Sequence, residues 1–96
     1  MATRDTLSFK AVGAVVRSIA GRDRKREFIV IGERDGETLI ADGRLHRVSS
    51  PKKKNPRHLK LITHLTESEA ELFASSPNDE TVQDILKCAI RRTQTD

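Results

Sequence analysis

Short β-branched runs separated by glycine turns constrain the fold of this chain more than any other feature of its sequence. The first run is VGAVVRSI at residues 12–19, with Gly21 after it, and the second is FIVIGER at residues 28–34. Two Asp-Gly dipeptides follow, with ETLIA (37–41) between them and RLHRV (44–48) after them. β-Branched residues favour strands, and Asp-Gly tolerates the positive φ angles of hairpin turns. We therefore predict four short strands, the last three forming a meander.

The next segment predicts a loop and then a fifth strand. Pro51 and Pro56 flank a run of lysines, and proline does not pair within a central strand, so an exposed basic loop is expected. HLKLI at residues 58–62 alternates apolar and polar residues, which is the pattern of a half-buried strand. Five strands this close together leave no room for crossover helices and favour a small antiparallel sheet or barrel, for which the SH3-like barrel is the natural candidate.

The C-terminal third changes to a helical period. Thr66 and Glu69 have capping-box spacing and predict a short helix that could rest on the barrel through Ala70, Leu72 and Phe73. Ser76 is expected to cap a second helix with Pro77 at its first position. That helix has an apolar stripe, formed by Val82, Ile85, Leu86, Ala89 and Ile90, which could dock on the barrel or on a partner.

The predicted fold class is therefore mainly β with C-terminal α, a barrel of about five antiparallel strands followed by one or two short helices. We divide the chain into an N-terminal extension (1–11), the barrel (12–64) and an acidic helical segment (65–96).

Charge is distributed unevenly along the chain. Residues 1–64 contain 15 Lys and Arg against 7 Asp and Glu, whereas residues 65–96 contain 3 against 7. A basic region of this size suggests a polyanionic partner, although a solvated charged surface would have the same composition. The acidic end suggests a different role, such as contact with a basic protein.

The cations that could contact phosphate fall into three stretches. The first has Arg22, Arg24, Lys25 and Arg26; the second has Arg44, His46 and Arg47; the third has Lys52, Lys53, Lys54, Arg57, His58 and Lys60. Lys and Arg on loops and strand ends are the usual phosphate contacts in complexes with nucleic acid. The first stretch could also be a solubilising hairpin tip, and the lysine run a flexible charged loop or a localisation signal.

Other chemistry has little support in the sequence. Cys88 is alone and is expected to pack as a small apolar residue, and the histidines lack the partners of a metal site. The sequence contains no nucleotide-binding glycine loop and suggests no catalytic triad, so we expect neither an enzyme nor a bound cofactor. Apolar runs are too short for a membrane helix, a signal peptide is not evident, and a lone cysteine suits a reducing compartment, so a cytoplasmic location is expected.

Three motifs in order carry a family resemblance. GAVVRSIAGRDRKREFIVIG resembles the KOW motif, in which a strand, a glycine turn, a basic loop and a second strand open an SH3-like barrel. The later ADGRLHRV and PKKKNPRHL are similar to the continuation in a bacterial family of KOW-domain RNA-binding proteins. That family in turn resembles KOW-bearing large-subunit ribosomal proteins of archaea and eukaryotes. Gly21 matches the turn glycine, whereas the second glycine usual in the motif is absent and Phe28 stands near its place.

The resemblance implies a non-catalytic protein that binds RNA through its basic loops, with ribosomal RNA as the expected ligand. The near absence of aromatic residues disfavours a base-stacking platform and favours recognition of structured RNA by shape and backbone. The alternative function is a protein–protein adaptor of the translation or transcription machinery, with ribosomal proteins as possible partners. Neither function involves a membrane or a small-molecule substrate.

Overall fold

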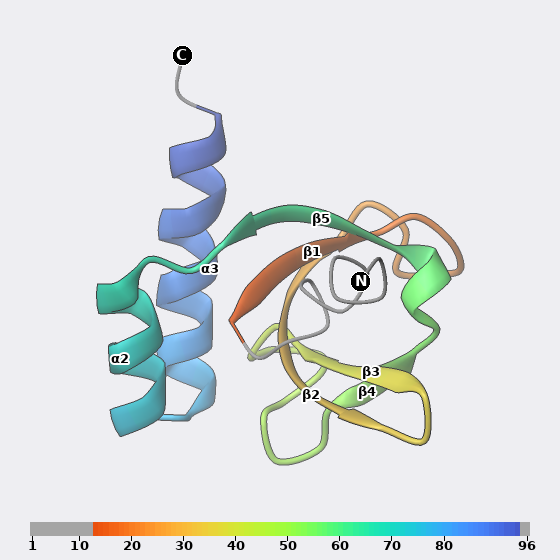
Figure 1. Cartoon of the computed structure of the whole chain (residues 1–96), viewed down its shortest axis with the longest axis horizontal. Coiled ribbons are helices and arrows are strands. Elements are labelled where there is room, and N and C mark those ends of the chain that lie inside the picture. The colour runs from red at the N-terminus through yellow and green to blue at the C-terminus, as the bar shows by residue number, and fades with distance from the viewer. Residues whose placement is uncertain (1–12, 95–96) are drawn as a thin grey trace, which may run out of the picture.

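The computed structural model describes residues 13–94, which form one five-stranded antiparallel sheet followed by two helices (Figure 1). The strand order is β4-β3-β2-β1-β5. The strands are β1 (Ala14–Ser18), β2 (Glu27–Arg34), β3 (Glu37–Ala41), β4 (Lys52–Lys54) and β5 (Leu59–His64). A 3-10 turn, η2 (Pro56–His58), precedes β5, and the helices are α2 (Glu67–Ser75) and α3 (Asp79–Thr93). The predicted class, mainly β with C-terminal α, is confirmed.

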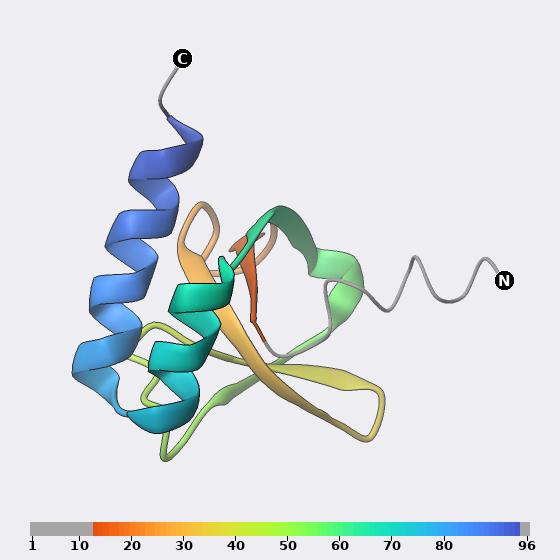
Figure 2. The same cartoon turned by 60° about the vertical axis from the view of Figure 1, so that its left-hand side comes forward.

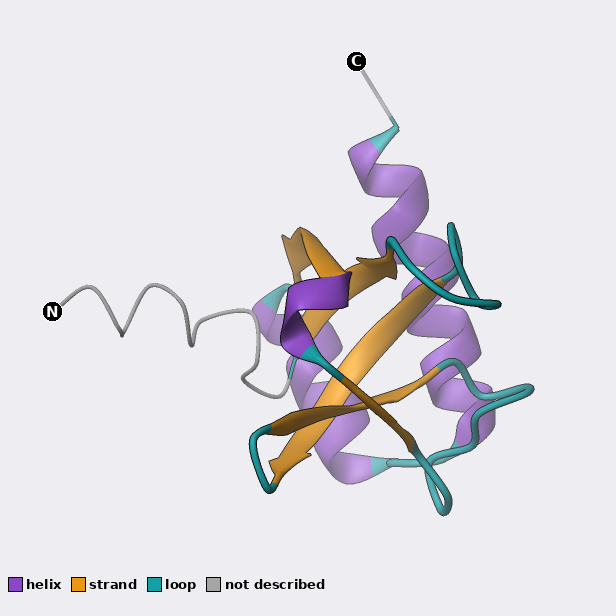
Figure 3. Ribbon diagram, turned by 90° about the vertical axis from the view of Figure 1, so that its right-hand side faces the viewer, coloured by secondary structure: helices purple, strands orange, loops and turns teal. Residues whose placement is uncertain are grey.

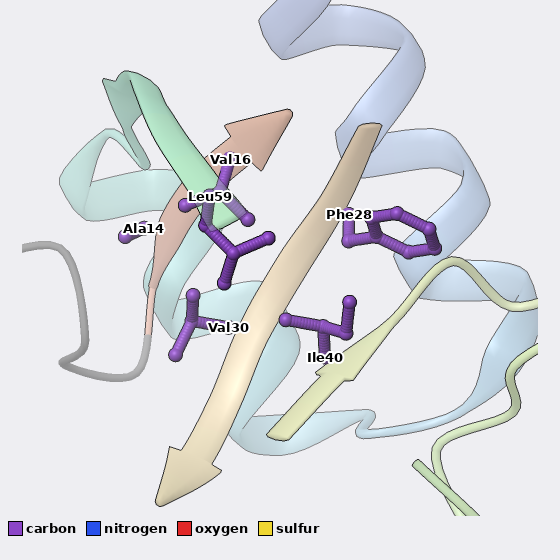
Figure 4. Packing of buried hydrophobic residues seen from close by; sticks show 6 residues of the cluster. All are labelled: Ala14, Val16, Phe28, Val30, Ile40 and Leu59. Carbon is purple, nitrogen blue, oxygen red and sulfur yellow. The ribbon is translucent and has the colours of Figure 1, made fainter. Parts of the chain in front are cut away.

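The central strands β1 and β2 are buried on both faces, which explains their continuous apolar sequences. Val15 and Ile29 are cross-strand partners and face the helices. The neighbours of Val15 and Ile29 in each strand belong to a second cluster inside the curved sheet. This cluster is formed by Ala14, Val16, Phe28, Val30, Ile40 and Leu59 (Figure 4). Alternate side chains of a strand point to opposite faces, so each strand contributes to both clusters.

The β2–β3 connection is the predicted two-residue turn. Asp35 has φ 53° and Gly36 has φ 82°, the left-handed conformations that a primed hairpin turn requires. Arg34 is paired with Glu37 in the register of the two strands, as expected.

The predicted strand at residues 44–48 is wrong, because Asp42 closes a side-chain turn there instead of a hairpin. Asp42 Oδ1 accepts hydrogen bonds from the backbone N–H groups of Arg44 (2.9 Å) and His46 (3.0 Å). The N–H groups of Asp42 and Gly43 donate back to the His46 carbonyl at 2.9 and 3.1 Å. An Asp side chain bonded to the following backbone competes with strand pairing.

The lysine run forms strand β4 in place of the strand predicted at residues 44–48. The prediction of an exposed loop between Pro51 and Pro56 is therefore also wrong. Lys52 pairs with Ile40, and Lys54 pairs with Thr38, at the edge of the sheet. Pro51 and Pro56 flank the strand without lying in it, and proline is tolerated at those positions. The sheet curves so that β1 and β5 lie across from β3 and β4 (Figure 1), and the pairings recorded within residues 13–94 do not include one between β4 and β5.

The helices lie side by side along one side of the sheet (Figure 2). The capping box of α2 is confirmed: Thr66 Oγ1 accepts from the Glu69 N–H, and Glu69 Oε1 accepts from the Thr66 N–H. Of the three apolar residues expected to anchor α2, Phe73 packs against the helix-side cluster, whereas Ala70 and Leu72 are exposed. Within residues 13–94, none of the helices combines the length and hydropathy needed to cross a membrane.

Helix α3 differs from expectation at its start but not in its stripe. Asn78, not Ser76, is the N-cap, because its side chain accepts a hydrogen bond from the Thr81 N–H at 2.8 Å. Pro77 therefore lies before the helix. The stripe packs against Val15 and Ile29, with Val82, Ile85, Leu86 and Ala89 buried and Ile90 partly buried. Cys88 is exposed, so the expectation that it packs as an apolar residue is wrong.

Candidate nucleic-acid interface

The β1–β2 connection at residues 19–26, here named the basic loop, carries the first basic stretch. Backbone hydrogen bonds join its two ends. The N–H of Ser18 donates to the Arg26 carbonyl (2.9 Å), and the N–H of Lys25 donates to the Ser18 carbonyl (2.8 Å). Gly21 has φ 83°, as a turn glycine requires, and Lys25 has φ 77°. Lys25 is therefore the other left-handed residue of the loop, whereas Phe28 lies within β2.

A buried ion cluster lies beneath the basic loop. Asp23 is 5% exposed, and its Oδ1 accepts from Lys54 Nζ (2.8 Å) and from the Ser18 hydroxyl (2.8 Å). Lys54 Nζ also donates to the Ala20 carbonyl at 2.9 Å. Lys52 Nζ lies 3.0 Å from Asp23 Oδ2 in an ion pair. The cluster thus joins the basic loop to β4.

The ion cluster fixes the charge state of Asp23. Burial alone would raise the pKa of this carboxyl, but the hydrogen bonds from Lys54 and Ser18 and the ion pair with Lys52 outweigh it and hold the pKa well below its ordinary value. Asp23 is therefore ionised at neutral pH and balances one of the two lysines that approach it.

The first basic stretch is displayed to solvent, whereas one member of the third stretch is not. Arg22, Arg24, Lys25 and Arg26 are all exposed. Lys54 is 8% exposed and its ammonium is engaged below the loop, so it supports the surface rather than forming part of it.

The second basic stretch lies on the β3–β4 loop, and α3 holds this loop in place. Gln83 Nε2 donates to the Gly43 carbonyl (2.8 Å), and the Val48 N–H donates to Asp79 Oδ1 (2.8 Å). Gly43 has φ 80°, and a Cβ at this position would collide with the Asp79 backbone. The His46 ring lies against Phe28, with ring centroids 5.8 Å apart. The basic loop and the β3–β4 loop lie on the same side of the sheet (teal, right-hand side of Figure 3).

Parts of all three basic stretches meet at one open concavity of about 240 Å³, here named the basic depression. Its lining comes from the basic loop, the β3–β4 loop and β4, and consists of Arg22, Asp23, Arg26, Leu45, His46 and Lys52. Four of the thirteen candidate residues therefore share one site, although they are spread over thirty positions of the sequence. Because Asp23 is engaged below and Lys52 is ion-paired with it, the groups offered to a ligand are the two guanidinium groups of Arg22 and Arg26, an imidazole and one apolar side chain.

The other candidates lie elsewhere. Arg24 and Lys25 are exposed on the basic loop, and Arg47 is exposed on the β3–β4 loop, but none of them lines the depression. Arg44 lines a separate groove of about 480 Å³ beside α3, with acidic and basic neighbours.

The remaining members of the third stretch are exposed on β4, η2 and β5; these are Lys53, Arg57, His58 and Lys60. Of these elements, η2 is tied to the basic loop, since the Ile19 N–H donates to the His58 carbonyl at 2.9 Å. None of these four cations lines the depression.

Sequence reasoning missed the residues that hold the site together. Asp23 and Ser18 organise the basic loop, and Asp79 and Gln83 position the β3–β4 loop. The one local signal was Asp23 itself, because a single acid among four cations in a tight turn has a strong reason to be paired.

Comparisons with known proteins add no family assignment. A scan against protein-family models gives no match, and a search of curated proteins finds no similar sequence.

Proposed function

We propose that this protein is a non-catalytic RNA-binding module of the KOW type, which binds structured RNA, of the kind found in ribosomes, through the basic depression and the cations around it. We also propose a cytoplasmic location. The proposal joins the resemblance of residues 12–62 to a bacterial KOW family with the placement of the basic residues.

The observation that carries the proposal is the convergence of Arg22, Arg26, His46 and Lys52 on one depression. A surface that is only solubilising is expected to carry interspersed charges of both signs, whereas cations from three segments gather here. Arg22 and Arg26 have no ion pair among the interactions recorded within residues 13–94, so their guanidinium groups can donate to phosphate oxygens.

A rigid basic site suits recognition of an RNA backbone. The hydrogen-bonded loop and the ion cluster below it fix the backbone that carries Arg22 and Arg26 before binding, which reduces the ordering cost of association. Each phosphate contact releases condensed counterions, so affinity should fall steeply with salt.

The affinity of a labelled RNA hairpin tests the proposal. The double variant Arg22→Ala/Arg26→Ala should bind about tenfold or more weakly and should reduce the slope of log K against log salt by about two. The control is Arg34→Ala/Lys87→Ala, which removes the same charge from exposed positions outside the depression. Equal weakening by both variants, with both folded, would show general charge attraction and contradict the proposed site.

An adaptor function would need a surface other than the stripe of α3. That stripe is packed against Val15 and Ile29 within the chain. Partners retained after nuclease treatment would support an adaptor, and we rank it below RNA binding because its expected contact surface is buried.

A further inference from the structure

The most exposed of the large apolar side chains recorded within residues 13–94 lies in the basic depression. Leu45 is 66% exposed, compared with 49% for Ile19 and 48% for Leu72. A single exposed leucine is ordinary on a protein surface. Leu45 differs because cations surround it and because the backbone that carries it is held on both sides.

The hydrogen bonds of the Asp42 turn fix Leu45 in this outward position. The residues before and after it, Arg44 and His46, both donate their backbone N–H groups to Asp42 Oδ1. The His46 ring occupies the space against Phe28, so the His46 side chain is the one that turns inward.

Both ends of this turn are anchored to α3. Gly43 accepts a hydrogen bond from Gln83, and Val48 donates one to Asp79. Leu45 therefore lies in a turn whose backbone is already fixed, so binding a ligand requires little further ordering of that backbone.

The depression suits one unit of a polymer better than a free small molecule. Its volume of about 240 Å³ is open to solvent and lies below the roughly 300 Å³ at which small-molecule pockets begin. It offers cations on its walls and an apolar group beside them. A nucleotide presents the complementary pair, a phosphate and an apolar base face.

We infer that Leu45 packs against an unpaired base of the bound RNA while Arg22 and Arg26 hold the neighbouring phosphates. This inference rests on the proposed RNA-binding function and specifies its ligand. In a regular A-form helix the bases are stacked and their faces are hidden, whereas a bulged nucleotide exposes one. Leu45 is thus a specificity-determining residue that distinguishes RNA with a bulge from a perfect duplex.

The test compares two labelled RNA hairpins, one with a perfect stem and one with a single unpaired adenosine in the same stem. The wild-type protein should prefer the bulged hairpin by about tenfold, and Leu45→Ala should remove that preference without changing the salt slope, because no phosphate contact is lost. Leu45→Phe should retain or increase the preference, since an aromatic ring stacks better on a base. Leu72→Ala, an exposed leucine on α2, is the matched control and should bind like wild type.

The outcomes separate this inference from the function on which it rests. Failure of the wild-type protein to bind either hairpin would overturn both. Binding of both hairpins without preference would overturn the inference alone. Equal weakening of the two hairpins by Leu45→Ala would also overturn it, because Leu45 would then contact the backbone of any duplex.

Discussion

Lys54 Nζ lies 2.8 Å from Asp23 Oδ1, and this contact joins β4 to the basic loop across 31 positions of the chain. Both side chains are almost fully buried, although the lysine belongs to a run that the sequence predicts to be an exposed loop. The pair explains how the backbone that carries four neighbouring cations is held at the surface.

Removal of Asp23 should destabilise the protein strongly. Asp23→Ala leaves the buried Lys54 ammonium without its counter-charge, and breaking one side of a buried pair costs about 3–5 kcal/mol. Urea denaturation measures the change in the free energy of unfolding. Glu33→Ala, at an exposed position of β2, should change it by less than about 0.5 kcal/mol. A similar small change for both variants would refute the structural role of the cluster.

The contribution of Asp23 to stability should depend on pH. Its pKa is lower in the folded protein than in the unfolded chain, so the contribution is fully present above the unfolded value near 4 and is lost as pH falls toward the folded value. The difference in unfolding free energy between wild type and Asp23→Asn should therefore be constant from pH 7 to about pH 5 and shrink below about pH 4. A difference that does not change down to pH 2 would show that Asp23 has an ordinary pKa.

Two glycines with nearly the same φ allow the cost of backbone strain to be measured separately from the cost of a steric collision. Gly36 has φ 82° and nothing near its missing Cβ, whereas Gly43 has φ 80° and lies against the backbone of Asp79. Gly36→Ala should cost about 1–2 kcal/mol through the left-handed conformation alone. Gly43→Ala should cost clearly more, because the β3–β4 loop must move off α3. Thermal unfolding of the two variants gives the comparison, and equal losses would mean that the loop is not held by the helix.

Lys25 takes the conformation for which glycine is better suited. Its φ of 77° strains a residue that has a Cβ, so Lys25→Gly should leave stability unchanged or raise it by up to about 1 kcal/mol. Lys53→Gly, in the regular backbone of β4, should lower it by about 0.5–1 kcal/mol. The opposite order in denaturant midpoints would contradict the left-handed conformation of Lys25.

The local elements were predictable from sequence because their causes lie within a few residues. The turn at Asp35 and Gly36, the capping box at Thr66 and the stripe of α3 depend on neighbours in the chain. The second Asp-Gly looks the same in sequence, yet Asp42 and Gly43 form a different turn, in which the Asp42 side chain bonds the following backbone and α3 lies against Gly43. Only the folded chain brings those segments together.

The candidate site was predictable in composition but not in arrangement. The three basic stretches are visible in sequence, and four of their residues do line one depression. Nothing local distinguishes Lys54, which is buried on Asp23, from Lys53, which is exposed on the same strand. The assignment of each lysine depends on a partner that is distant in the sequence.

In the proposed function, three segments of the chain form one RNA-binding depression. Amide chemical shifts of the ¹⁵N-labelled protein, followed during titration with an RNA hairpin, test it most directly. We expect saturable shifts at Arg22, Arg26, His46 and Lys52 with a common affinity, and little change at Arg34 and Gly36 in the β2–β3 turn. Shifts confined to other surfaces, or different affinities for the three segments, would contradict it.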